Sequence, residues 1–196
     1  MSSDPNGLDR INSYAIVAYI PQPLAGYLDR LRQELVPNCF LRAHITVLPP
    51  RPISSTPESA WNQVRMLARR FLPFKIELTG VEVFRASDVI HVSVGAGFVS
   101  LEQMHEAMNT GGLKFKEPHG YHPHVTLAQD LKSDEVDELV DVARHRWAEF
   151  GFERSFQVET ITFVQATRWK QWIDLGECNL GRDDARLVGD LAASRA

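Results

Sequence analysis

One short pattern, a histidine and a threonine two residues apart among aliphatic residues, occurs once in each half of the chain. It stands as Ala43-His44-Ile45-Thr46-Val47-Leu48 and again as Pro123-His124-Val125-Thr126-Leu127-Ala128. Such residues favour β structure, and side chains alternate between the two faces of a strand. Each motif therefore predicts a strand with one apolar face and one His/Thr face. Two such strands facing a common cleft would bring together two imidazoles and two hydroxyls.

The polar residues of the motifs, which are His44, Thr46, His124 and Thr126, suit hydrolysis of a phosphodiester. An unperturbed imidazole has a pKa of about 6.5, so one histidine can remove a proton while the other donates one. The threonine hydroxyls can donate to the non-bridging phosphate oxygens as charge shifts in the transition state. Because two acid–base groups and several donors need no metal ion, we predict neither a metal nor another cofactor.

On these two motifs the chain resembles the two-histidine (2H) phosphoesterase superfamily, in its branch of 2′-5′ RNA ligase-like proteins and RNA 2′,3′-cyclic phosphodiesterases. The resemblance follows the order of elements from about Ser13 to Leu175, although only the motifs are specific. It implies an α+β fold of two pseudo-symmetric lobes, each with an antiparallel sheet and flanking helices, and a cleft between them. It also implies hydrolysis of a 2′,3′-cyclic phosphate of an RNA end or a nucleotide. We assign His124 as the base, His44 as the acid, and Thr46 and Thr126 as phosphate-binding residues.

The sequence departs from the branch at two places that bear on the substrate. Relatives that process RNA ends often carry Arg or Lys five residues after the second motif histidine, and here that residue is Gln129. The first motif continues as Pro49-Pro50-Arg51-Pro52 instead of the common Phe-Leu-Gly. Three alternatives stay open: a 2′-5′ RNA ligase or small-nucleotide phosphodiesterase, a non-catalytic RNA- or nucleotide-binding module, and a structural protein with coincidental motifs.

Outside the motifs, a turn at 167–171 carries two cations and an aromatic residue. Arg168 or Lys170 could contact a phosphate, and Trp169 or Trp172 could stack on a base. A surface turn with a tryptophan tucked beneath it is the alternative interpretation. We name Arg168, Trp169 and Lys170 as possible substrate-binding residues.

We assign no catalytic role to the other histidines. We place His122 at the rim of the site, His91 as a hydrogen-bonded strand residue and His105 on the surface. His119, His122 and His124 also raise a metal alternative. However, Pro123 interrupts their spacing and no Asp, Glu or Cys lies close by in sequence, which argues against a metal.

Hydrophobic periodicity and breaker residues predict alternating helices and strands. Helices are expected at 23–35, 56–71, 99–108 and 133–150, and strands at 14–20, 43–48, 74–78, 81–84, 89–94, 161–164 and 172–175. Thr56 is the expected N-cap of the second helix, with Pro57 in its first turn. This order of elements leaves antiparallel and α/β arrangements open, and the family resemblance favours the antiparallel one.

Composition limits the classes of partner. The 196 residues are 44% hydrophobic with a net charge of −4 and a pI of about 6, which argues against a sequence-independent DNA binder. Cys39 and Cys178 lie far apart, and we expect reduced thiols in a cytoplasmic monomer. No signal-like or membrane-length apolar run is found. We predict a disordered tail at 1–12, one bilobal domain at 13–180, and a tail at 181–196 for which a frayed helix is one interpretation.

Overall fold

The two motif strands form the edges of two different antiparallel sheets. The computed structural model describes residues 9–37, 39, 41–182 and 184–189. The larger sheet has the strand order β2-β1-β7-β8-β9 and the smaller has the order β5-β4-β3-β6. The strands are β1 (Arg10–Tyr19), β2 (His44–Arg51), β3 (Phe74–Phe84), β4 (Val89–Val94), β5 (His124–Ala128), β6 (Ser155–Val158), β7 (Thr160–Thr167), β8 (Trp172–Asn179) and β9 (Ala185–Leu187).

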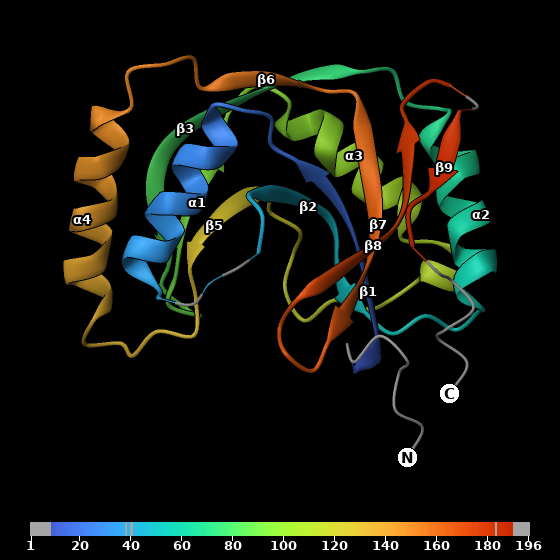
Figure 1. The fold of residues 1–196 in the computed structure, drawn as a ribbon, viewed down its shortest axis with the longest axis horizontal. Coiled ribbons are helices and arrows are strands. Elements are labelled where there is room, and N and C mark those ends of the chain that lie inside the picture. Colours follow the sequence, from blue (N-terminus) through green and yellow to red (C-terminus); the bar gives the residue numbers. More distant parts are fainter. Residues whose placement is uncertain (1–8, 38, 40, 183, 190–196) are drawn as a thin grey trace.

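Helices cover each sheet on one side. They are α1 (Leu24–Leu35), α2 (Pro57–Ala68), α3 (Phe98–Met108) and α4 (Val136–Glu149), with a 3-10 turn at Gly111–Leu113. The helices α1 and α4 pack by the smaller sheet, and α2 and α3 pack by the larger one (Figure 1). None of the helices in the described part of the chain is long and apolar enough to cross a membrane. The predicted α+β fold with two antiparallel sheets is therefore confirmed.

The edge strands β2 and β5 lie against each other in the middle of the molecule (Figure 1). One continuous buried cluster extends through both lobes, so the two sheets share a core. A second, small cluster of Ala15, Val17 and Val164, flanked by Tyr19 and Trp172, covers the opposite face of the larger sheet. This opposite face is the one that carries His44 and Thr46, because they pair with Tyr19 and Val17 in the adjacent strand.

The helix α2 begins with the N-cap residue that the sequence predicts. The Thr56 side chain accepts a hydrogen bond from the Ser59 backbone N–H at 3.2 Å, and Pro57 occupies the first turn. The predicted N-cap is therefore confirmed.

Two strand predictions were wrong in extent. The first strand begins at Arg10 instead of Tyr14, because Arg10 pairs with Thr167 in β7 and Gln165 donates to the Ile11 carbonyl. Residues 10–12 of the predicted tail are thus ordered in a sheet, and residues 1–8 lie outside the described residues. The strand β3 is continuous where two strands were expected. Residues 74–77 pair with β6, and the register with β4 shifts between Leu78 and Val81.

The C-terminal segment also differs from the helical interpretation. Residues 185–187 form β9, which pairs with β8, and β8 itself runs to Asn179 instead of ending at Leu175. An exposed strand edge offers unpaired backbone groups, and the segment satisfies them by adding a short strand. Residues 183 and 190–196 lie outside the described residues.

Candidate active site

The predicted alternation of faces holds in both motif strands. The aliphatic residues are at most 1% exposed, and they are Ile45, Val47, Val125 and Leu127. On the other face His44 is 9% exposed, and Thr46, His124 and Thr126 are half-buried. Because the two strands lie against each other, the four polar side chains come from neighbouring strands of the two lobes.

Both motif histidines are held in the same tautomer. The Nδ1 atom of His44 lies 2.6 Å from the Arg42 carbonyl oxygen, and Nδ1 of His124 lies 2.7 Å from the His122 carbonyl oxygen. A carbonyl can only accept, so Nδ1 donates and carries the proton. In each neutral ring Nε2 therefore keeps its lone pair, ready to accept a proton, and in each charged ring Nε2–H can donate one.

Burial favours the neutral form of both rings. It lowers the pKa of His44 to about 4, and the charge of Arg32, together with that of His124 when its ring is protonated, acts in the same direction. The carbonyl of Arg42 opposes this by stabilising the charged ring. Burial also lowers the pKa of His124 below its ordinary value. An anionic phosphate beside the rings would favour their charged forms and raise both pKa values.

Each motif histidine rests against an aromatic ring of its own lobe. The Trp172 ring at the start of β8 lies 4.6 Å from the His44 ring, measured between centroids. The Phe84 ring at the end of β3 lies 5.0 Å from His124 in an edge contact. Of the two tryptophans considered for base stacking, Trp172 thus lies beside the first catalytic candidate, whereas Trp169 is exposed on the turn.

A third histidine lies beneath the second motif. His91 in β4 pairs with Thr126 across the sheet, and its ring centroid is 5.2 Å from that of His124. It is 1% exposed, and neither ring nitrogen meets the geometry of a hydrogen bond among the described residues, although a backbone contact with Val89 acts to raise its pKa. The predicted hydrogen bond of this strand histidine is therefore at most this weak contact. Burial lowers the pKa of His91 to about 4, so it is neutral at pH 7.

His105 was expected on the surface, and this prediction was wrong. The side chain is buried, with Nδ1 2.9 Å from the Val47 carbonyl oxygen in β2. The Tyr121 ring stacks on it at 4.0 Å between centroids, and the Tyr121 hydroxyl donates to the Thr46 carbonyl at 2.8 Å. Helical spacing could have shown this burial, because His105 continues the stripe that contains Leu101.

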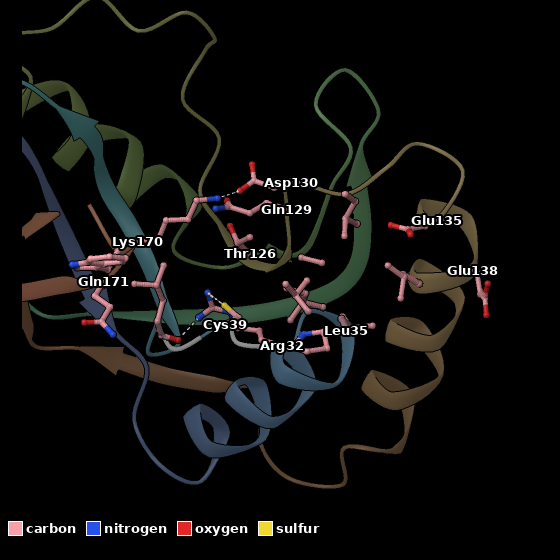
Figure 2. Close-up of a pocket in the computed structure, with 18 residues that line it drawn as sticks. Arg32, Leu35, Cys39, Thr126, Gln129, Asp130, Glu135, Glu138, Lys170 and Gln171 are labelled. Atoms are coloured by element: carbon pink, nitrogen blue, oxygen red, sulfur yellow. Dashed lines mark hydrogen bonds and ion pairs between the residues drawn. The ribbon is translucent and has the colours of Figure 1, made fainter. Parts of the chain in front are cut away.

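The turn residues divide into two groups. Trp169 and Lys170 line a groove of about 680 Å³ together with Thr126, whereas Arg168 is exposed outside it. Figure 2 shows Lys170 and Thr126 in this groove. Lys170 Nζ forms an ion pair with Asp130 Oδ2 at 2.7 Å. His122 is exposed and packs against Phe84, and its place at the rim of the site stays a prediction. In the part of the chain that the structure describes, no three His, Cys, Asp or Glu side chains are grouped as metal ligands.

A family model described as the 2′-5′ RNA ligase superfamily matches residues 20–168. "Putative phosphoesterase BLi01284/BL02661" of Bacillus licheniformis is 26% identical over 135 residues, which are 68% of this chain and 80% of that protein. "Putative phosphoesterase OB1230" of Oceanobacillus iheyensis is 23% identical over 87% of this chain and 99% of its own length.

Solved structures show the same fold. Escherichia coli LigT complexed with 3′-AMP superposes with a TM-score of 0.60 at 17% identity, covering 87% of this chain and 99% of LigT. A crystal structure described as a phosphoesterase gives a TM-score of 0.61 at 16% identity, over 86% of this chain and 98% of that one. These similarities cover both lobes, so the fold of the two sheets is shared.

Proposed function

The chain belongs to the 2′-5′ RNA ligase superfamily, and from that premise we propose that it is a metal-independent phosphodiesterase acting on the 2′,3′-cyclic phosphate of an RNA end or a nucleotide. The observation that carries the proposal is that His44 and His124 have the same tautomer and the same kind of hydrogen-bond partner. Both rings donate through Nδ1 to a carbonyl two residues earlier and leave Nε2 for the substrate. The names of the phosphoesterase relatives support the broader activity.

In the proposed reaction, Nε2 of one neutral histidine accepts a proton from water as the water oxygen bonds to phosphorus. The bond from phosphorus to the 2′ or the 3′ oxygen then breaks, and Nε2–H of the other histidine protonates the leaving oxygen. The product is a phosphate monoester beside a free hydroxyl. Thr46 and Thr126 donate hydrogen bonds to the non-bridging oxygens, where charge accumulates.

The assignment of His124 as base and His44 as acid stays a prediction. The deeper burial of His44 supports the opposite assignment, because a buried ring holds a proton less readily and suits a base. A substrate with an activated leaving group separates the two roles. A p-nitrophenyl phosphodiester needs little protonation of its leaving group, so the variant that lacks the acid should retain far more activity on it than the variant that lacks the base.

The decisive experiment measures hydrolysis of adenosine 2′,3′-cyclic monophosphate in the presence of EDTA. We expect turnover by the unmodified protein and a loss of about 100-fold or more in kcat for His44→Ala and for His124→Ala. His145→Ala, on the exposed face of α4, is the matched control and should keep full activity. Turnover that EDTA abolishes would contradict the metal-free mechanism, and a near-native rate in either motif variant would remove that histidine from it.

The class of substrate is also part of the proposal. Escherichia coli LigT has been crystallised with 3′-AMP, NADP+ and ATP, which supports a nucleotide-sized ligand for a chain of this fold. Binding of these nucleotides without any turnover would favour the alternative of a non-catalytic binding module.

A further inference from the structure

The groove that begins at Thr126 continues away from the motif histidines. It passes between α1, α4 and the β7–β8 turn, and we call it the Thr126 groove (Figure 2). Its volume of about 680 Å³ is within the range of small-molecule sites. Gln129, which replaces the cation common in RNA-processing relatives, also lines it.

A buried cation lies on the wall of the Thr126 groove. Arg32 of α1 is 4% exposed, and Figure 2 shows its side chain extending from α1 to Cys39. Its Nη1 donates to the Leu41 carbonyl at 2.8 Å, and its Nη2 lies 3.4 Å from the Cys39 sulfur. Its Nε has no hydrogen-bond partner, and no carboxylate forms an ion pair with it among the described residues.

This environment leaves the charge of Arg32 uncompensated. A guanidinium withdrawn from water is costly unless an anion is paired with it, and a carbonyl and a thiol supply only dipoles. Arg32 also lies near enough to His44 for its charge to lower the pKa of that ring. Among the described residues, Arg32 is therefore a cation without a paired carboxylate, close to the proposed catalytic imidazole and on the wall of an open groove.

The charges along the groove show which end would take an anion. Lys170 lines the part near Thr126, where its ion pair with Asp130 is exposed on both sides and so contributes little energy. A phosphate could replace Asp130 there at small cost. Glu135 and Glu138 line the part beside α4 and would repel an anion. Arg32 and Lys170 thus supply the positive charge that an anion bound in the groove would meet.

On the premise of the proposed phosphodiesterase, we propose that the Thr126 groove binds a second phosphate of the substrate through Arg32. The preferred substrate class is then a nucleotide that carries a further phosphate beyond the scissile phosphodiester, as an oligonucleotide end does. The cation missing at Gln129 is supplied from α1, a different element of the fold. A guanidinium suits this role because it offers several donors in one plane to phosphate oxygens.

Binding of products tests the inference independently of turnover. We expect adenosine 3′,5′-bisphosphate to bind about 10-fold or more tightly than adenosine 3′-monophosphate in calorimetry, because a charged hydrogen bond to phosphate is gained. Equal affinities would overturn the inference. In the matched assay, adenosine 2′,3′-cyclic monophosphate bearing a 5′-phosphate should show a similarly higher kcat/KM than the same compound without it.

The outcomes separate the two proposals. No turnover of either cyclic compound would contradict the proposed function, while the ratio of product affinities would still decide the inference. Turnover of both cyclic compounds with the same kcat/KM would contradict the inference alone.

Two variants test whether Arg32 causes the difference in affinity between the two products. Arg32→Gln should bring the affinity ratio of the two products close to one, and Arg30→Gln, which removes an exposed charge from the same helix, should leave the ratio unchanged. An unchanged ratio in a folded Arg32→Gln protein would overturn the assignment to Arg32. If that variant does not fold, the comparison of ligands on the unmodified protein still decides whether the second phosphate is recognised.

Discussion

At the scale of single residues, the site depends on how burial changes the chemistry of an imidazole. His44, His91 and His124 all have lowered pKa values, and burial is the largest cause in each case. His44 and His124 have a carbonyl partner for Nδ1, whereas the ring nitrogens of His91 have none that meets the geometry of a hydrogen bond in the described structure. The first two rings are thus oriented for proton transfer, and His91 is a neutral neighbour of Thr126 and His124.

The lowered pKa values predict an acidic optimum for kcat/KM. The base must be deprotonated, so activity rises as pH passes the pKa of the base, and the acid must be protonated, so activity falls above the pKa of the acid. Both values lie below about 6.5 in the free protein, so the maximum of kcat/KM should lie below about pH 6.5.

The pH profile of kcat should be shifted to higher pH, because kcat reports the complex in which the substrate anion stabilises the charged rings. Steady-state kinetics from pH 4 to 9 would measure both profiles. An optimum of kcat/KM above pH 7 would show that the free histidines do not have the environment described.

At the scale of elements, the Tyr121 side chain ties the segment before the second motif to the first motif. Tyr121 lies just before the second motif, and its hydroxyl donates to the backbone of Thr46 in the first. Its ring stacks on His105, which is itself bound to β2. The segment that leads into β5 is therefore tied to β2, and the spacing of the two edge strands depends on this contact.

Tyr121→Phe should lower kcat by about 10-fold with a smaller change in KM, since a misplaced catalytic group costs more in the transition state than in binding. The free energy of unfolding should fall by only about 1 kcal/mol, the typical contribution of one hydrogen bond. Tyr14→Phe is the control, because its hydroxyl accepts a hydrogen bond from Gln165 within the larger sheet. An equal loss of kcat in both variants would indicate a general effect of stability.

At the scale of the whole molecule, the departure at Arg51 has a structural role in holding the segment that connects the two lobes. Arg51 is 1% exposed and forms an ion pair with Glu117 in the segment that precedes the second motif. Its Nη1 donates to Asn109 at 2.8 Å, at the end of α3. The residue that interrupts the common Phe-Leu-Gly pattern therefore connects β2 to the elements that lead into β5.

Arg51→Ala should lower the free energy of unfolding by about 3–5 kcal/mol, because it leaves the Glu117 carboxylate without its buried partner. Arg85→Ala, which breaks the exposed ion pair with Asp137, should cost less than about 1 kcal/mol. Urea denaturation measures both. Equal small losses would show that the buried pair does not stabilise the attachment of this connecting segment to β2.

The sequence by itself determined those features that depend on near neighbours. Alternation along a strand is a local property, so the placement of His44 with Thr46 and of His124 with Thr126 followed from the residues alone. The same is true of the Thr56 cap. The interpretation of the two motifs as one site also came from the residues, whereas the antiparallel arrangement of the sheets needed the family resemblance, because the order of helices and strands allowed another topology.

The tertiary structure alone decided which distant residues surround the motifs. Arg32, His91, Trp172 and Tyr121 lie in different elements and approach the motifs through sheet pairing, helix packing or the close approach of loops. Their burial and missing partners are set by residues far along the chain. Long-range pairing leaves no periodic signal in the sequence, so the two histidine motifs could be recognised from the sequence, whereas the packing of distant residues around them could not.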